Sequence, residues 1–351
     1  MKNKILLLCM ALALIASLVL LGCSAPAPAP KPSPSPTPTP TATPSPAPAP
    51  VEKINLRFSA QWPEPSPIFK VIFKPILEEI EQKSKGRITF TVFGASLLGG
   101  AADQYDLVRT GKADMGTTST GYTPGRFPLS DVLTFPGAYE TSEAGQQVSQ
   151  AVADRMLNKE FPDTKLLSLW QTQTFYLYTA NKQIRKLEDM KGVKIRSAGG
   201  IVTPALEAVG ATPVHMPLPD SYLALQTGVV EGAIFGPSAG PTYKLHEVLK
   251  HALKFKWGYQ VNLLNVNPDT WAKIPDDLKP IMVEASRKAG FNEATLPATD
   301  DPIMTKSLLD RGGSSYTLPP DEEARWINAI KPVINKWVSD QEAKGQPVQE
   351  L

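Results

Sequence analysis

The stretch "LEDMKGVKIRSAGGIVTPALEAVGATPVHMPLPDSYLALQTGVVEG", residues 187–232, contains a short apolar strand that ends in a permanent cation. In its "GVKIR" segment apolar and basic residues alternate, so Arg196 lies on the strand face opposite Ile195. A loop containing Gly199 and Gly200 follows and leads into a predicted helix. The stretch therefore predicts a strand-loop-helix unit with a charged side chain at the carboxyl end of the strand.

Arg196 has two interpretations. In open α/β sheets, ligands bind beyond the carboxyl ends of the strands, which is where Arg196 stands. Its guanidinium presents two parallel donors that match a carboxylate, which a lysine cannot do. The alternative is a structural ion pair with Glu207 or Glu231. The residues alone leave both interpretations open.

Strands and helices alternate outward from this stretch. The pattern predicts strands, separated by helices, over residues 54–62, over residues 87–94 and at the end of residues 102–120. Pro75 is expected to kink the first of these helices. The alternation restarts in residues 164–218, and the C-terminal third is mostly helical. This order is typical of parallel sheets covered by helices. We therefore predict an α/β fold of two lobes with a cleft between them.

The N-terminus has the features of an export signal. Two lysines precede an apolar run, and Gly22 and Cys23 follow it, which is typical of a secretory signal peptide over residues 1–22. "LLGC" resembles the bacterial lipobox, in which the cysteine is acylated, whereas the alternative is a membrane-spanning helix. Residues 24–50 alternate proline with Ala, Ser or Thr, which favours an extended tether. We expect residues 23–52 to be a lipidated Cys23 plus tether, which anchors the protein outside the cytoplasm on the cell membrane.

Composition excludes several functions. Signal removal leaves Cys23 as the only cysteine, so disulfides and cysteine metal sites are not expected. The formal net charge is +2 with acids and bases interspersed, which does not indicate a nucleic-acid surface. The sequence has no P-loop and no G-x-G-x-x-G motif, and we expect no cofactor.

Two motifs resemble a catalytic serine site and a metal site, but their spacing does not support either function. "GPSAG", residues 236–240, matches a nucleophile elbow around Ser238, but His246, Glu247 and His251 follow too closely, on one predicted helix, to form a triad. "HEVLKH" places its histidines five residues apart rather than four, so they cannot share one helical face around a metal ion. We expect neither a catalytic site nor a metal site. A secreted serine esterase built on Ser238 is a less favoured alternative.

The opening stretch, together with "NKQIRK", "SKGRITFTVFGASLLGGAADQYDLVRTGKADMG" and "PGRFPLSDVLTFP", resembles the solute-binding subunits of TRAP transporters. That family is typified by C4-dicarboxylate- and sialic-acid-binding proteins, and the resemblance covers nearly all of residues 53–345. It implies the two-lobed fold of periplasmic binding proteins (class II-like), with a ligand cleft between lobes that are joined by crossing strands and a long bent helix. We expect lobe I to comprise residues 53–173 with 262–301, and lobe II residues 174–261 with 302–345.

The resemblance also implies a function. Such a protein is a receptor and not an enzyme: it captures a small carboxylate and delivers it to small and large membrane subunits that use an ion gradient. Arg196 matches the family arginine that clamps the ligand carboxylate. We expect a monomer. The alternative is a binding protein of an ATP-driven importer or of a signalling receptor.

One departure from the family bears on the ligand. A second arginine of many dicarboxylate and sialic-acid binders falls at Tyr176 here, so a monocarboxylate such as a keto, hydroxy or aromatic acid becomes an option. The further predicted ligand contacts lie at strand ends, in turns and at the lobe crossing: Gln61, Trp62, Thr118, Ser119, Gln173, Tyr176, Phe235 and Ser238. Of these, Trp62 and Phe235 could instead be core aromatics, and the Thr and Ser side chains could satisfy backbone groups of the turns.

Overall fold

The structure is a computed structural model that describes residues 53–137, 139, 142–155, 157–346 and 348. The expected signal peptide, Cys23 and the tether lie outside the described residues. None of the helices in these ranges is both long enough and apolar enough to cross a bilayer.

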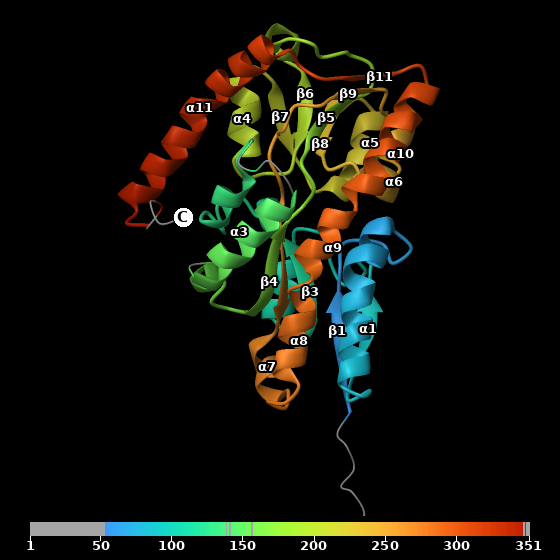
Figure 1. The fold of residues 1–351 in the computed structure, drawn as a ribbon, viewed down its shortest axis with the longest axis vertical. Coiled ribbons are helices and arrows are strands. Elements are labelled where there is room, and N and C mark those ends of the chain that lie inside the picture. Colours follow the sequence, from blue (N-terminus) through green and yellow to red (C-terminus); the bar gives the residue numbers. More distant parts are fainter. Residues whose placement is uncertain (1–52, 138, 140–141, 156, 347, 349–351) are drawn as a thin grey trace, which may run out of the picture. The chain divides into compact units, whose positions relative to one another are not determined.

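The first sheet forms the core of one lobe, in the lower part of Figure 1. Its strand order is β2-β1-β3-β10-β4, with β1 parallel to β2 and β3, and β10 antiparallel to β3 and β4. The predicted order of strand, helix, strand, helix and strand from residue 54 is confirmed. The strands are β1 (Ile54–Ser59), β2 (Ile88–Phe93), β3 (Met115–Ser119), β4 (Lys165–Gln171) and β10 (Val261–Val266).

The first helix begins with a widened turn. A π-helix, η1 (Phe69–Phe73), runs into α1 (Lys74–Lys83), with Pro75 at the second position of α1. Proline lacks the N–H that would continue the regular ladder, so the expected irregularity occurs in the turn before Pro75. The predicted buried face packs in the core of this lobe and consists of Ile68, Phe69, Ile72, Phe73, Ile76, Leu77 and Ile80.

The second sheet forms the core of the other lobe. Its order is β11-β9-β5-β8-β6-β7, and β6 is parallel to both β7 and β8. The carboxyl ends of these three strands therefore meet at one edge. The strands are β5 (Tyr176–Thr179), β6 (Lys194–Ser197), β7 (Thr212–His215), β8 (Gly232–Phe235), β9 (His251–Leu253) and β11 (Ser314–Tyr316).

The prediction that His246 and His251 share one helix is wrong. His246 lies in a short 3₁₀ helix, η7 (Leu245–Glu247), whereas His251 begins β9. Strand β9 pairs with β5 and β11, and this tertiary pairing overrides the local helical pattern.

The chain crosses between the sheets twice. Residues 172–175 lead from β4 to β5, and residues 254–260 lead from β9 to β10. The two crossings are hydrogen-bonded to each other: Thr172 N donates to Gln260 O at 2.8 Å and Phe175 N to Gly258 O at 2.8 Å. A two-stranded ladder therefore joins the lobes.

Helices provide the remaining connection. Helices α8, α9 and α10 follow one another from the first sheet to the second (Figure 1); α8 packs on α1 and β4, and α10 on β9 and β11. The C-terminal helix α11 packs on α4 (Val202–Ala208), and its predicted stripe has Trp326, Ile330 and Trp337 buried. The residue limits expected for the two lobes stay a prediction. The last four helices of the chain are α8 (Lys279–Ser286), α9 (Ala289–Thr295), α10 (Pro297–Asp310) and α11 (Pro320–Ala343).

The remaining helical elements connect the strands. The helices are α2 (Gln104–Arg109), α3 (Ser142–Arg155), α4 (Val202–Ala208), α5 (Ser221–Gln226), α6 (Ala239–Thr242) and α7 (Pro268–Lys273). The 3₁₀ helices are η2 (Thr120–Tyr122), η3 (Ser130–Thr134), η4 (Leu157–Glu160), η5 (Leu187–Met190) and η6 (Leu218–Asp220).

Gly258 in the crossing ladder allows a test of this fold. Its φ is +103°, and a Cβ added there would come within 2.1 Å of Thr134 O, a backbone atom that cannot easily move. We expect Gly258→Ala to lower the free energy of unfolding by about 2–4 kcal/mol, because backbone strain and steric overlap add. Gly228→Ala is the control, since Gly228 has φ +74° with no atom within 4 Å, and it should cost about 1 kcal/mol. Urea unfolding measures both, and equal losses would contradict the prediction.

Candidate functional site

Arg196 lies at the edge where the carboxyl ends of β6, β7 and β8 meet. Its side chain is buried, with the residue 1% exposed, whereas Lys194 two positions earlier is exposed. Arg196 Nε donates to Met216 O at 2.9 Å, and Nη1 donates to Ile234 O at 2.9 Å. Two backbone carbonyls therefore fix the orientation of the guanidinium.

The third guanidinium nitrogen of Arg196 has no such partner. Nη2 is buried and has no partner of hydrogen-bond geometry among the described residues, while Tyr122 lies beside the guanidinium, with its ring centroid 5.9 Å from Cζ, and favours the charged form. Neither Glu207 nor Glu231 forms an ion pair with it, and Glu231 instead accepts from Lys194 N at 3.0 Å. The structural ion pair considered above is therefore not formed in the described part of the chain.

The electrostatics of Arg196 favour an anion. Burial lowers its pKa from the usual value, and the nearby Tyr122 and Tyr243 partly offset this. Arginine nevertheless stays charged in proteins. A buried cation with an unused donor is costly unless an anion pairs with it. The arrangement can therefore bind a carboxylate.

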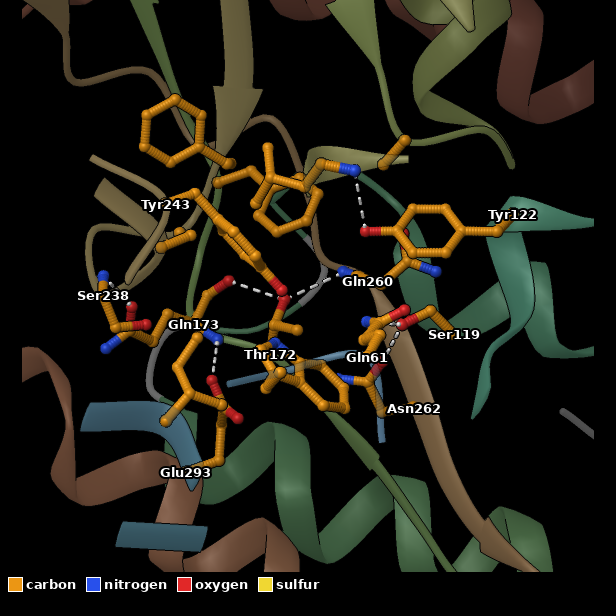
Figure 2. A pocket seen from close by; sticks show the side chains of 18 of the residues that line it. Gln61, Ser119, Tyr122, Thr172, Gln173, Ser238, Tyr243, Gln260, Asn262 and Glu293 are labelled. Atoms are coloured by element: carbon orange, nitrogen blue, oxygen red, sulfur yellow. Dashed lines mark hydrogen bonds between the residues drawn. The ribbon is translucent and has the colours of Figure 1, made fainter. Parts of the chain in front are cut away.

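Arg196 lines a cavity of about 40 Å³ between the two lobes (Figure 2). Side chains from both sheets, both crossing segments and α9 surround it. The lining consists of Gln61, Trp62, Ile68, Ser119, Tyr122, Thr172, Gln173, Phe175, Arg196, Ala198, Leu218, Phe235, Gly236, Ser238, Ala239, Tyr243, Gln260, Asn262 and Glu293.

Most of the residues predicted from the sequence line this cavity. Trp62 and Phe235 also pack as core aromatics: the ring centroids of Trp62 and Phe73 lie 5.0 Å apart, and those of Phe235 and Tyr178 4.5 Å apart. Trp62 and Phe235 therefore line the cavity and also pack in the core. The predicted residues in the lining are Arg196, Gln61, Trp62, Ser119, Gln173, Phe235 and Ser238.

Tyr176 and Thr118 do not line the cavity. The Tyr176 ring packs under Lys254, whose Nζ lies 4.4 Å from the ring centroid. Thr118 precedes Ser119 in β3, and successive side chains of a strand point to opposite faces. The exclusion of Thr118 follows from strand phase, which the sequence alone did not determine. Tyr176 instead shares a sheet face with its register partner Phe235, and its ring packs against Lys254 outside the lining.

Several lining residues were missed. Tyr122 follows the predicted turn by three residues, while Tyr243 and Glu293 belong to helical segments without any distinguishing motif. Gln260 and Asn262 alternate with apolar residues at the start of β10, and such polar residues in a buried strand were a usable signal. Tyr122, Tyr243 and Glu293 reach the site through the tertiary fold, and no sequence pattern marks them.

Two glutamine networks order the polar part of the cavity (Figure 2). Gln173 Oε1 accepts from Ser238 N at 2.9 Å, and Gln173 N donates to Glu293 Oε1 at 3.2 Å. On the other side, Gln61 Nε2 donates to Ser119 Oγ at 2.9 Å. These bonds leave Gln173 Nε2, Gln61 Oε1 and the Tyr243 hydroxyl buried without a partner among the described residues. Together with Arg196 Nη2, they form a set of polar atoms suited to a polar ligand.

The lobes touch at the edge of the cavity. Gly199, with φ +92°, lies so close to the first lobe that an added Cβ would come within 2.0 Å of Gly121 O. Nearby, Leu218 N donates to the Tyr122 hydroxyl at 3.3 Å. The structure therefore has the lobes closed over the cavity.

Among the described residues, neither histidine that follows Ser238 is bonded to it. His246 Nδ1 lies 3.2 Å from Gly240 O, and His251 Nδ1 lies 3.0 Å from Ser314 Oγ. Ser238 follows β8 in the turn before α6, and its backbone N–H bonds to Gln173. In the described ranges, no group of three or more His, Cys, Asp or Glu residues is arranged to hold a metal ion.

Comparison with known proteins identifies the class of protein. The model of the bacterial extracellular solute-binding protein family 7 matches residues 58–341, so this chain belongs to that family. It is a family of solute-binding proteins rather than of enzymes, and its TRAP members work with TRAP membrane subunits.

Individual relatives agree with this class. The C4-dicarboxylate-binding periplasmic protein DctP of Rhodobacter capsulatus is 27% identical over 288 residues, which cover 80% of this chain and 86% of that protein. A TRAP solute-binding protein from Rhodoferax ferrireducens with copurified benzoate has a TM-score of 0.79 and 28% identity, covering 85% of this chain and 95% of that chain. A marine metagenome TRAP solute-binding protein with 3-hydroxybenzoate has a TM-score of 0.78 and 27% identity, covering 84% and 94%. The predicted family and the two-lobed fold are confirmed.

Asp131 provides a test of the contact between the lobes. An added Cβ on Gly200 would come within 2.9 Å of Asp131 Oδ1, so this carboxyl of η3 lies against the second lobe. Burial, together with the charge of Glu160, raises the pKa of Asp131 to about 7. In the unfolded chain the pKa is about 3.9, so the folded state loses stability as the pH rises from about 4 to 7.

We therefore expect Asp131→Asn to raise the free energy of unfolding by about 1–2 kcal/mol at pH 8, where the wild type carries a partly buried anion, and by less at pH 5. Urea unfolding at the two pH values measures the difference. Asp163→Asn, at an exposed position of the same lobe, is the control. An equal gain at both pH values for Asp131→Asn would show that its charge is not responsible.

Proposed function

We propose that this solute-binding protein captures a small monocarboxylate between its lobes and presents it to a TRAP permease. The observation that carries the proposal is the buried guanidinium of Arg196, with two nitrogens held by carbonyls and Nη2 unpaired. A carboxylate at Nη2 would receive a charge-assisted hydrogen bond in place of its water shell.

The composition of the lining supports one carboxylate rather than two. Arg196 is the only basic residue and Glu293 the only acidic residue among the described residues of the cavity. A second carboxylate would therefore lack a cation and would meet an acidic neighbour. Tyr176, at the position of a second family arginine, is also outside the lining.

The apolar lining supports an aromatic acid. Trp62, Phe175 and Phe235 contribute rings to the cavity, and Tyr122 and Tyr243 contribute further rings near Arg196. Relatives with the same fold bind such acids: benzoate, 3-hydroxybenzoate, and mandelate in a protein from Bordetella bronchiseptica of 25% identity and TM-score 0.76. We infer that a small aromatic monocarboxylate is the preferred ligand class.

Closure would strengthen the binding of the carboxylate. The second lobe contributes Arg196, whose geometry is fixed by its own lobe, and the first lobe contributes Tyr122 and Gln61 across the cleft. When the lobes meet, water leaves the cavity and the interaction between carboxylate and guanidinium strengthens in the lower dielectric. Preorganised donors also reduce the entropy lost on binding.

We further propose that residues 1–22 are removed and that Cys23 is acylated, so that the tether of residues 24–50 holds the protein at the membrane surface. The basis is the sequence "LLGC" and the proline-rich composition that follows it. Such an anchor keeps the receptor close to the permease while the tether allows it to reach soluble ligands.

Arg196→Ala tests the clamp. We expect the affinity for the cognate acid to fall by about 2–4 kcal/mol, because the buried carboxylate loses its charged partner. The acid is first identified by thermal shift with benzoate, hydroxybenzoates, mandelate, pyruvate and succinate, and the affinity is then measured by calorimetry. Lys194→Ala, an exposed cation on the same strand, is the matched control and should bind normally. Unchanged affinity in Arg196→Ala would remove the clamp from the proposal.

Cys23→Ser tests the anchor. The wild type should sediment with membranes and incorporate radiolabelled palmitate, because acylation of Cys23 makes membrane attachment stable. The variant should lose the label and appear in the soluble fraction. Palmitate incorporation that persists in Cys23→Ser would contradict the assignment.

A further inference from the structure

We propose that Gln61 selects, among the carboxylates of the proposed function, those that carry a hydroxyl group at the end remote from the carboxylate. The inference rests on that proposed function and concerns the opposite wall of the same cavity. Gln61 follows β1 of the first lobe, whereas Arg196 belongs to β6 of the second. Both residues line the same cavity, so a ligand that spans the cleft from Arg196 reaches the lobe that carries Gln61.

The hydrogen bonds around Gln61 fix the orientation of its amide. Ser119 Oγ donates its single proton to Asn262 Oδ1 at 2.6 Å, so it can only accept from Gln61. Gln61 therefore directs Nε2 to Ser119, at 2.9 Å, and turns Oε1 away from it (Figure 2). Oε1 is buried in a residue that is 3% exposed, and it has no partner among the described residues. It is an acceptor that requires a donor.

The part of the cavity lined by Gln173 and Arg196 presents hydrogen-bond donors instead of an acceptor. The backbone N–H of Ser238 donates to Gln173 Oε1 at 2.9 Å, which fixes that amide with Nε2 as an unpartnered donor. Arg196 Nη2 is another unpartnered donor in the lining, and the Tyr243 hydroxyl, which can donate or accept, is also without a partner among the described residues. The cavity therefore presents donors on β6 of the second sheet and on the crossing segment that holds Gln173, and an acceptor after β1 of the first sheet. The complementary ligand has a carboxylate at one end and a donor at the other.

Hydroxyl is the donor that fits best. A ketone or a second carboxylate would place lone pairs against Oε1, and an unsubstituted ring would leave Oε1 buried and unpaired. An ammonium group would bring three N–H donors and a charge to one neutral acceptor, which leaves most of its hydration unreplaced. A hydroxyl has a single proton and satisfies Oε1 with it.

A neighbouring pocket provides room for a ring. The inner cavity of about 40 Å³ has space for only a few water molecules. A second pocket of about 370 Å³ lies beside it, and the two share Gln61 and Tyr243 as lining residues. The buried Tyr243 hydroxyl makes no hydrogen bond to a described residue that would hold the ring in place. Rotation of Tyr243 would join the two spaces beside Gln61.

Calorimetry with matched acids tests the proposal on the mature protein. The probes are benzoate, its 2-, 3- and 4-hydroxy isomers, 3-formylbenzoate and 3-(aminomethyl)benzoate. We expect the better of the 3- and 4-hydroxy isomers to bind at least fivefold more tightly than benzoate, and 3-formylbenzoate to bind more weakly than benzoate. The 2-hydroxy isomer is a positional control, since its hydroxyl stays beside the carboxylate and should not improve binding.

Variants then assign the preference to Gln61. Gln61→Met should reduce the advantage of the hydroxy acid over benzoate to less than twofold, whereas Gln226→Met, at an exposed position, should keep it. Ser119→Ala removes the group that orients the amide, so the gap between 3-hydroxybenzoate and 3-formylbenzoate should shrink. This second variant provides a separate readout if Gln61→Met does not fold.

The outcomes separate this inference from the proposed function. If benzoate or 3-(aminomethyl)benzoate binds as tightly as the best hydroxy acid, or if Gln61→Met keeps the hydroxyl preference, the inference is wrong while carboxylate capture stands. If no acid of the panel binds the wild type, the proposed ligand class itself is wrong.

Discussion

The burial of one permanent charge at the edge of a sheet is the constraint on which the site depends. Three strands, β6, β7 and β8, run parallel and end together, which brings Met216 O and Ile234 O to the Arg196 guanidinium. These carbonyls offset part of the desolvation cost without neutralising the charge. The cation is therefore rigid and still capable of pairing with an anion. A site of this kind does not have to reorganise when its ligand arrives.

Sequence reasoning succeeded where one local signal determined the position of a side chain. The position of Arg196 follows from a short alternating strand that ends at a glycine loop, which predicts a side chain at the carboxyl edge of a parallel sheet, while its role as a carboxylate clamp is implied by the family resemblance and stays a prediction. The order of strands and helices likewise determined the fold class. Tyr122, Tyr243 and Glu293 were missed because each reaches the cavity through the folding of separate segments, and none lies in a recognisable motif.

The errors have a common physical origin. Thr118 and Ser119 are neighbours in β3, yet only Ser119 faces the cavity, since a step of one residue reverses the direction of a strand side chain. His251 was assigned to a helix from local pattern, but it pairs in β9 with strands that are distant in sequence. Strand phase and long-range pairing depend on the assembled sheet, so a single sequence does not determine them.

Backbone contact between Gly121 and Gly199 has a mechanical consequence. Main-chain atoms form a hard stop for the closing motion, because no compressible side chain lies between them. If the lobes open and close, this contact sets the end point of closure, and every solute that allows the contact to form would leave the same outer contour. A membrane partner that recognises this contour can sense occupancy without touching the cargo.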